Sequence, residues 1–241
     1  MTGLVCVAAG PGAPGATTVA LAAALTAECG SALLVDADGD GGSLAAHLGA
    51  ATTPGLVTLA AATRHSYSGS ELKRHIQPVT GEVGLLAAPS NPEQASAALI
   101  ALGRPFAESL TAHTAVADVG RWRPDNPAEC LVGVADATVL VVRPTLAGVA
   151  SARWSYRDLS ARCAHVVVAT RGERPYGPDE VAAAVGCPPS DVVVLPVDRA
   201  GASLITNSVS SRWLRRAALA RTIRAMALEL WPVASDDGVL V

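Results

Sequence analysis

The feature that most constrains the fold of this chain is a series of seven short runs of consecutive apolar residues. Uninterrupted apolar character is typical of strands covered on both faces, as in a parallel sheet, whereas a half-exposed strand alternates with polar residues. The runs occupy residues 4–9, 32–35, 83–87, 115–117, 138–142, 166–169 and 192–195. Helix-like segments separate them, at residues 17–28, 92–102, 105–113, 148–161, 178–185 and 211–230. This alternation predicts an α/β fold of three layers, doubly wound, with a mostly parallel sheet of about seven strands.

Length and composition fit one domain without a membrane span. The 241 residues suit a single domain, predicted at residues 1–233, followed by a frayed tail at residues 234–241. Lysine and arginine total 18 against 21 aspartates and glutamates, and this formal charge of −3 gives no bulk attraction to nucleic acid. Five scattered cysteines without a CxxC pair, and an N-terminus without a signal-peptide pattern, predict a cytoplasmic protein. A peripheral position at a membrane stays open as an alternative.

A glycine-rich loop joins the first apolar run to the first helical segment. Residues 10–18 read GPGAPGATT; glycines here let backbone N–H groups turn inward, and the dipole of the following helix favours negative charge. The phosphate-loop pattern GxxxxGK[ST] is matched at Gly10, Gly15 and Thr17, but Ala16 occupies the lysine position. On these residues alone, a tight turn in another kind of α/β protein explains the loop equally well.

Carboxylates at the ends of two other apolar runs strengthen the interpretation of the loop as an anion site. Asp36 and Asp38 close the second run and Asp118 closes the fourth, at the carboxyl edge where open α/β sheets bind ligands. The stretch VDAD at residues 35–38 resembles the second strand of the MinD/ParA family of P-loop ATPases. The resemblance continues in order through residues 53–56, 83–89, 115–120, 137–145 and 195–198. The Gly-Ala-Thr-Thr end of the loop resembles the CpaE/TadZ branch of this family and its septum-site relatives.

The resemblance implies a P-loop NTPase fold with a nucleotide and magnesium site. The residues at nucleotide-binding positions are Gly10, Gly12, Gly15, Ala16, Thr17, Thr18, Thr170 and Pro196. Thr17, Asp36 and Asp118 stand at metal-binding positions, Asp38 stands at the catalytic position, and Thr170 replaces an asparagine that contacts adenine. The implied cofactors are ATP or ADP with Mg²⁺. The implied partners are a second copy of the chain, as a homodimer, and proteins of a pilus, secretion or division machine.

The loop lacks the lysines that the family carries. Pro11 and Ala16 stand at the two lysine positions, and Lys73 is the only lysine of the chain. A charge-assisted hydrogen bond to phosphate is worth about 1.5–3 kcal/mol, and losing a donor to transition-state charge slows a reaction about 10²–10³-fold. The sequence therefore predicts weak nucleotide binding with little or no ATP hydrolysis. A slow, nonstandard ATPase is the alternative, and Arg143 and Arg121 are the best-placed replacement cations.

The last helical segment, residues 211–230, interleaves five arginines with large apolar side chains. This pattern is typical either of a closing helix packed on the sheet or of a basic amphipathic helix on a membrane, and DNA contact is a further alternative. The segment directly follows the turn at residues 196–198, where the final helix of the fold belongs, so packing on the sheet is favoured. We expect Trp213 and Leu214 to point toward the protein.

Overall fold

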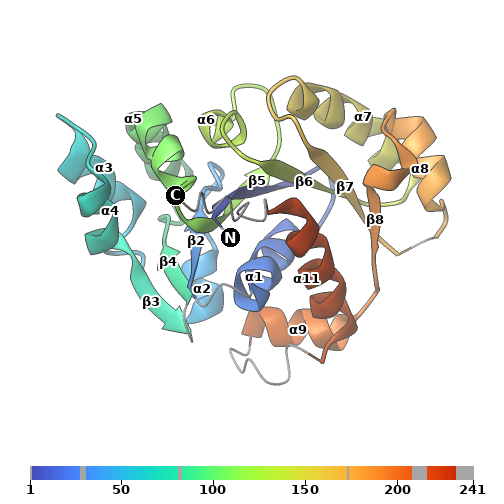
Figure 1. Ribbon diagram of the computed structural model, residues 1–241, viewed down its shortest axis with the longest axis horizontal. Helices are drawn as coiled ribbons and strands as arrows, with labels where there is room; N and C mark the ends of the chain where they lie inside the picture. Colours follow the sequence, from blue (N-terminus) through green and yellow to red (C-terminus); the bar gives the residue numbers. More distant parts are fainter. Residues whose placement is uncertain (1, 28–30, 81–82, 173, 208–215, 232–241) are drawn as a thin grey trace, which may run out of the picture.

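An eight-stranded sheet forms the centre of the protein (Figure 1). The computed structural model describes residues 2–27, 31–80, 83–172, 174–207 and 216–231. The strand order is β3-β4-β2-β5-β1-β6-β7-β8, and every neighbouring pair is parallel except β3 with β4. The strands are β1 (Gly3–Ala9), β2 (Ala32–Asp36), β3 (Gln77–Thr80), β4 (Val83–Leu86), β5 (Thr114–Arg121), β6 (Ala137–Val142), β7 (Val166–Arg171) and β8 (Val192–Leu195). The predicted α/β class with a mostly parallel sheet is confirmed.

The sheet has one strand more than the sequence predicts. The additional strand is β3, which lies antiparallel at the edge of the sheet beside β4. It reads QPVT and contains no continuous apolar run, because an edge strand is less deeply buried than a central one. Pro78 is exposed, and an edge strand tolerates proline since some of its N–H positions face no partner strand. The predicted count is too low because the apolar pattern detects only strands that are buried on both faces.

Burial on both faces explains the continuous apolar runs. In β1, Leu4, Cys6 and Ala8 pack into one core, whereas Val5 and Val7 pack into the other. Successive side chains of a strand point to opposite faces, so a strand covered on both sides needs apolar residues at every position. The two cores lie between the sheet and the helices on either side of it (Figure 1).

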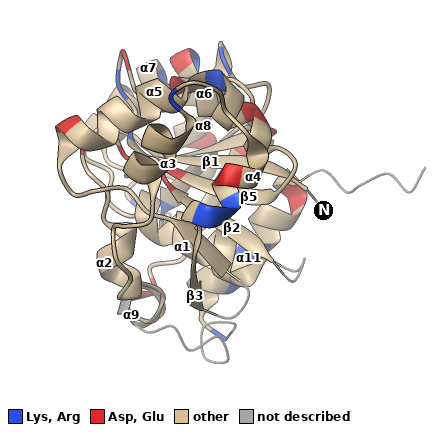
Figure 2. Ribbon diagram, turned by 90° about the vertical axis from the view of Figure 1, so that its left-hand side faces the viewer, with Lys and Arg blue, Asp and Glu red and all other residues tan. Residues whose placement is uncertain are grey.

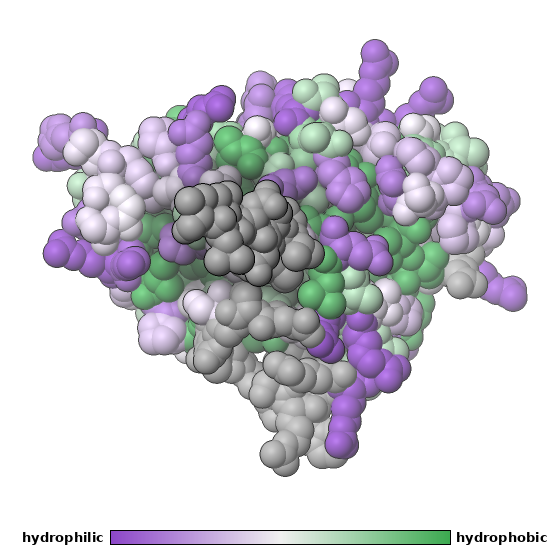
Figure 3. Space-filling model, in the orientation of Figure 1, coloured by the Kyte–Doolittle hydropathy of each residue, from purple (hydrophilic) through white to green (hydrophobic). Residues whose placement is uncertain are grey.

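Helices cover both faces of the sheet and complete the three predicted layers (Figure 1). One layer contains α1 (Ala16–Thr26), α2 (Leu44–Leu48), α9 (Arg199–Asn207) and α11 (Ala218–Leu230). The opposite layer contains α3 (Leu56–Thr63), α4 (Gly69–His75), α5 (Pro92–Leu110), α6 (Glu129–Val132), α7 (Leu146–Ser160) and α8 (Pro178–Val185). A short 3₁₀ helix, η1 (Pro189–Asp191), precedes β8. Hydrophilic side chains project around the outline of the face drawn in Figure 3.

The helix that follows β4 is interrupted where the sequence predicts two separate segments. Gly103 has a φ of 54° inside α5, a left-handed conformation that glycine adopts readily and that breaks the helix. Pro105 then restarts it, because a proline at the beginning of a helix needs no N–H donor. The predicted break is thus confirmed. The helices α3, α6 and α9 are not among the predicted segments.

The last helix packs its apolar stripe against the protein. The buried residues of α11 are Leu219, Ala220, Ile223, Met226, Ala227 and Leu230. Trp231 follows them, is 1% exposed, and donates a hydrogen bond of 3.1 Å from Nε1 to the carbonyl oxygen of Gly3. The closing-helix interpretation is confirmed for residues 218–230, whereas Trp213 and Leu214 lie outside the described residues. Within the described ranges, no helix combines the length and the apolar character needed to cross a membrane.

Candidate functional site

The glycine-rich loop connects β1 to α1 at the carboxyl edge of the sheet. Its first residue is tied to the neighbouring strand β6, because the N–H of Gly10 donates to the carbonyl oxygen of Val141 at 2.9 Å. The N–H of Ala13 then donates back to the carbonyl oxygen of Gly10 at 3.0 Å. Gly12 at φ 68° and Gly15 at φ 115° adopt left-handed conformations, so the turn itself requires these two glycines. No side chain caps the start of α1 at Gly15, which leaves N–H groups of the first turn for an anion.

Three of the predicted site residues meet beside this loop. Strands β2 and β5 pair with Asp36 directly opposite Asp118. The carboxylate of Asp118 accepts hydrogen bonds from the Thr17 hydroxyl and, at 3.2 Å, from the N–H of Gly120. One oxygen of Asp36 accepts from the N–H of Leu44 at 3.0 Å, while its Oδ1 is buried and has no partner among the described residues. The expected convergence of the loop and the carboxylates is confirmed, and their metal-binding role stays a prediction.

The chemistry of this cluster fits a magnesium ion. Burial, reinforced by the charge of Asp118, raises the pKa of Asp36 to about 7. Burial also raises the pKa of Asp118 to about 6, although the hydrogen bond from Thr17 opposes that shift. Mg²⁺ is usually held by one or two carboxylates together with waters and substrate phosphates. The unpartnered oxygen of Asp36 and the Thr17 hydroxyl suit such an ion. In the described part of the chain, no group of three or more His, Cys, Asp or Glu side chains is arranged to hold a metal ion by itself.

The raised pKa of Asp36 predicts how stability depends on pH. Its carboxyl group has a pKa of about 7 when folded against 3.8 as its ordinary value, so the folded protein binds more protons between these limits. Stability is therefore expected to fall as the pH rises through about 7. We expect Asp36→Asn to be more stable than the wild type at pH 8, by a margin that shrinks toward pH 5. Urea unfolding at both pH values measures the margin, with the exposed Asp179→Asn as control; a margin independent of pH would contradict the assignment.

Asp38 lies at the edge of the cluster, against Gly120 near the end of β5. Gly120 has a φ of 64°, and a side chain at this position would overlap the carboxylate of Asp38. Asp38 accepts a hydrogen bond from the N–H of Asp40 at 2.8 Å. Burial raises the pKa of Asp38, and the charges of Arg123 and Arg121 oppose this shift. Arg121, one of the predicted replacement cations, therefore lies near the predicted catalytic carboxylate, whose role stays a prediction.

A cavity of about 300 Å³ opens beside the end of the glycine loop. Three predicted nucleotide-binding residues line it, namely Gly15, Thr18 and Pro196. Apolar residues from β6, β8 and α11 form much of the remaining wall, as in pockets that bind the body of a small molecule. Thr170 is not among the lining residues: it is 1% exposed, and its hydroxyl lies 3.5 Å from the carbonyl oxygen of Gly172. Its predicted contact with a base stays a prediction.

Two arginines at this cavity are absent from the sequence candidates. Arg171 ends β7 and Arg199 begins α9, and both line the cavity. Asp198 lines it as well, but its carboxylate accepts hydrogen bonds from the N–H groups of Gly201 at 2.7 Å and Leu219 at 3.4 Å. These hydrogen bonds hold its pKa below the usual range and join the starts of α9 and α11. The sequence signal that could have identified these two arginines is their place at or after the last strands, because the ends of parallel strands gather at one edge of a sheet.

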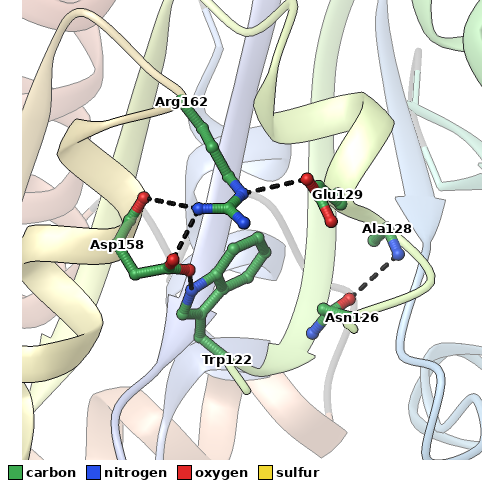
Figure 4. Close-up of polar contacts among 6 residues, drawn as sticks. All are labelled: Trp122, Asn126, Ala128, Glu129, Asp158 and Arg162. Atoms are coloured by element: carbon green, nitrogen blue, oxygen red, sulfur yellow. Dashed lines mark hydrogen bonds and ion pairs between the residues drawn. The ribbon is translucent and has the colours of Figure 1, made fainter. Parts of the chain in front are cut away.

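A polar network fixes the segment that follows β5 (Figure 4). The Nε1 of Trp122 donates to the carboxylate of Asp158 at 2.8 Å. The guanidinium of Arg162 bridges Asp158 to Glu129, with 3.1 Å between its Nε and the Glu129 oxygen. The same guanidinium lies 6.0 Å from the Trp122 ring centroid. Asn126 donates to the carbonyl oxygen of Arg121 at 3.0 Å and so restrains this segment a second time. The network thus holds the backbone that faces Asp38.

The effects of Trp122→Phe and Asp158→Ala on stability are expected to be non-additive. Trp122 is 2% exposed, so Asp158→Ala leaves its Nε1–H without a protein acceptor and lowers the free energy of unfolding by about 1–3 kcal/mol. Trp122→Phe removes that donor. The double variant should therefore lose less unfolding free energy than the two single variants lose together. Urea unfolding of wild type, both single variants and the double variant measures the coupling. Strict additivity would show that the hydrogen bond contributes nothing to stability.

The comparisons with known proteins concern the fold. The chain matches no protein-family model, and it matches no curated protein sequence. A solved ParA family ATPase from Chlorobium tepidum superposes with a TM-score of 0.74 and 19% identity, covering 95% of this chain and 99% of that one. The septum site-determining protein MinD of Pyrococcus horikoshii, solved with Mg-ADP, superposes with a TM-score of 0.74 and 20% identity, covering 98% of each chain. An apo McdA of Cyanothece gives a TM-score of 0.64 at 16% identity, over 93% of this chain and 98% of that one. The chain therefore has the fold of the MinD and ParA ATPases.

Proposed function

We propose that this protein is a spatial organiser of the MinD/ParA kind that binds an adenine nucleotide weakly and hydrolyses ATP slowly or not at all. The observation that carries the proposal is the convergence of an anion-accepting loop, a Thr17–Asp118–Asp36 cluster and an apolar cavity at one sheet edge. The loop suits phosphates, the cluster suits Mg²⁺, and the cavity suits a base. The similar Pyrococcus protein was solved with Mg-ADP, which supports the same class of ligand here.

The loss of lysine supports the second half of the proposal. Ala16 opens α1 and Pro11 lies in the loop, where neither supplies a cation. Lys73 cannot replace them, because it lies on α4 near His113, whose pKa is lowered by burial and also by the charge of Lys73. His113 directly precedes β5, whose opposite end carries Asp118, so Lys73 lies toward the amino edge of the sheet. The helix α4, which contains Lys73, lies on the side of the molecule that faces the viewer in Figure 2. Among the described residues, no lysine therefore lies at the loop to compensate phosphoryl-transfer charge.

The proposed mode of action is dimerisation and partner binding. A solved complex of MinC with MinD from Aquifex aeolicus superposes on this chain with a TM-score of 0.67 at 16% identity. This supports a protein partner for the present chain, and the homodimer rests on the family resemblance of the sequence. The Gly-Ala-Thr-Thr loop end supports a place in pilus, secretion or septum positioning, as in the CpaE/TadZ branch.

Two alternative functions rest on arginines. A slow, nonstandard ATPase is supported by Arg121, whose charge acts on Asp38, and by Arg143, which follows β6 and is exposed. DNA contact is supported by the arginines of the last helical segment. Membrane contact loses support over residues 218–230, because the apolar stripe of α11 is buried in the protein and not presented to a bilayer.

Calorimetric titration with ADP, with and without Mg²⁺, tests the nucleotide site. We expect binding that Mg²⁺ strengthens in the wild type but not in Thr17→Val, because this change removes the hydroxyl beside Asp118 while keeping the side-chain shape. Thr63→Val is the matched control, since that hydroxyl bonds to the carbonyl oxygen of Leu59 in α3. Absence of ADP binding at millimolar concentration would refute the proposal, and an equal Mg²⁺ effect in Thr17→Val would remove Thr17 from the metal site.

A further inference from the structure

An arginine-lined groove lies next to the proposed nucleotide cavity. It has a volume of about 640 Å³ and is open to solvent. Residues from the ends of β7 and β8 and from the first turns of α11 line it, including Arg171, Arg174, Arg221, Pro196 and Val197. Arg171 and Pro196 line both this groove and the nucleotide cavity, so the two spaces adjoin.

The three arginines of the groove form no ion pair with the carboxylates of the described residues. No carboxylate among the described residues lines the groove, and no ion pair or side-chain hydrogen bond is recorded for Arg171, Arg174 or Arg221. Arginines elsewhere do pair, such as Arg104 with Glu108 at 2.7 Å and Arg123 with Asp40 at 2.9 Å. Three guanidinium groups around one concave surface, without an ion pair among the described residues, favour an anion.

We propose that this groove is a second anion site. It receives a phosphate group that is attached to the nucleotide at a ribose position other than the 5′ position. The inference rests on the proposed nucleotide site, because Arg171 and Pro196 line both spaces. Guanidinium groups present paired donors that match phosphate oxygens, and such charge-assisted hydrogen bonds are stronger than neutral ones. The ligand class is therefore a ribonucleotide with phosphates at two positions, such as an adenosine bisphosphate.

A small ligand fits the groove better than a nucleic acid backbone. Tight binding to a duplex needs many phosphate contacts, because each neutralised phosphate releases counterions and adds to the affinity. The groove offers three arginines, and the whole chain has a formal charge of −3. The neighbouring apolar cavity of about 300 Å³ also favours a ligand whose base is enclosed while its second phosphate reaches the arginines.

The test compares ADP with its 3′-phosphorylated and 2′-phosphorylated forms by calorimetry on the full chain. We expect either the 3′-phosphorylated or the 2′-phosphorylated form of ADP to bind the wild type about 10–100-fold more tightly than ADP does. In Arg174→Ala/Arg221→Ala this advantage should fall to within about twofold, with the affinity for ADP itself unchanged. Arg153→Ala/Arg157→Ala, which removes two exposed arginines of α7, is the matched control and should keep the advantage.

The outcomes separate this inference from the proposed function. Binding of ADP with no gain from either extra phosphate would overturn the second anion site and leave the nucleotide site intact. Failure of every nucleotide to bind would overturn both. A labelled DNA duplex offers a further outcome. If it binds the wild type and loses affinity in the groove variant, while neither extra phosphate on ADP improves binding, the small-ligand assignment is overturned in favour of nucleic acid. An advantage that survives in Arg174→Ala/Arg221→Ala would place the second phosphate elsewhere.

Discussion

Purified wild-type protein is expected to release phosphate from ATP at less than about one turnover per minute, and Ala16→Lys alone is not expected to rescue it. The physical reason is that phosphoryl transfer depends on cations placed against the developing phosphate charge. The structure supplies Thr17, Asp36 and Asp118 for a metal, but it offers no lysine at the loop. Restoring one lysine replaces about 1.5–3 kcal/mol of interaction with phosphate. Pro11 still occupies the second lysine position, so most of the rate loss of about 10²–10³-fold per donor should remain.

The assay measures magnesium-dependent phosphate release by wild type, Ala16→Lys and Pro11→Lys/Ala16→Lys. Thermal unfolding with and without ADP shows in parallel that each variant is folded and whether it binds nucleotide. Asp38→Ala is the control for activity from the site itself, since Asp38 lies against Gly120 beside the loop. Faster wild-type turnover that Asp38→Ala abolishes would show that an arginine such as Arg121 supplies the missing charge. Turnover that Asp38→Ala leaves unchanged would indicate a contaminating ATPase.

Trp231→Ala is expected to lower the free energy of unfolding by about 3–5 kcal/mol. Trp231 is 1% exposed and belongs to the core between α1, α11 and the sheet. Its Nε1–H bonds to the carbonyl oxygen of Gly3, so the last described residue holds the first strand of the sheet. Truncation leaves a large cavity and an unpaired buried carbonyl. Because domains are stable by only about 5–15 kcal/mol, this one change removes a large part of the total.

Trp154→Ala is the matched control for this prediction. Trp154 lies on α7 and is 47% exposed, so its loss is expected to change stability by less than about 1 kcal/mol. Urea unfolding of both variants, with midpoints and slopes compared, measures the difference. Trp231→Phe should fall between them, since it keeps most of the apolar volume and loses the hydrogen bond to Gly3. Equal stability of Trp231→Ala and Trp154→Ala would show that the end of α11 is not part of the cooperative core.

The candidate site was predictable in outline because its parts are local in the sequence. A glycine loop between a strand and a helix, followed by carboxylates that close other strands, marks the carboxyl edge of a parallel sheet wherever it occurs. Gly15, Thr18 and Pro196, which the family resemblance placed at nucleotide-binding positions, line one cavity. The arginines of the cavity and groove were not predicted, because an arginine after a strand looks the same in sequence whether it meets solvent or a ligand.

The sequence by itself determined the class of the fold, because a strand buried on both faces must be apolar at every position, as β1 is. It also determined the missing charge of the loop, since Ala16 and Pro11 have no cation in any conformation. Tertiary structure alone decided the edge strand β3, which is too exposed to leave an apolar run. It also decided the network of Trp122, Asp158 and Arg162, whose members come from separate elements and meet only after folding. Local patterns report what each segment must bury, whereas the contacts between distant side chains are set by how the layers pack.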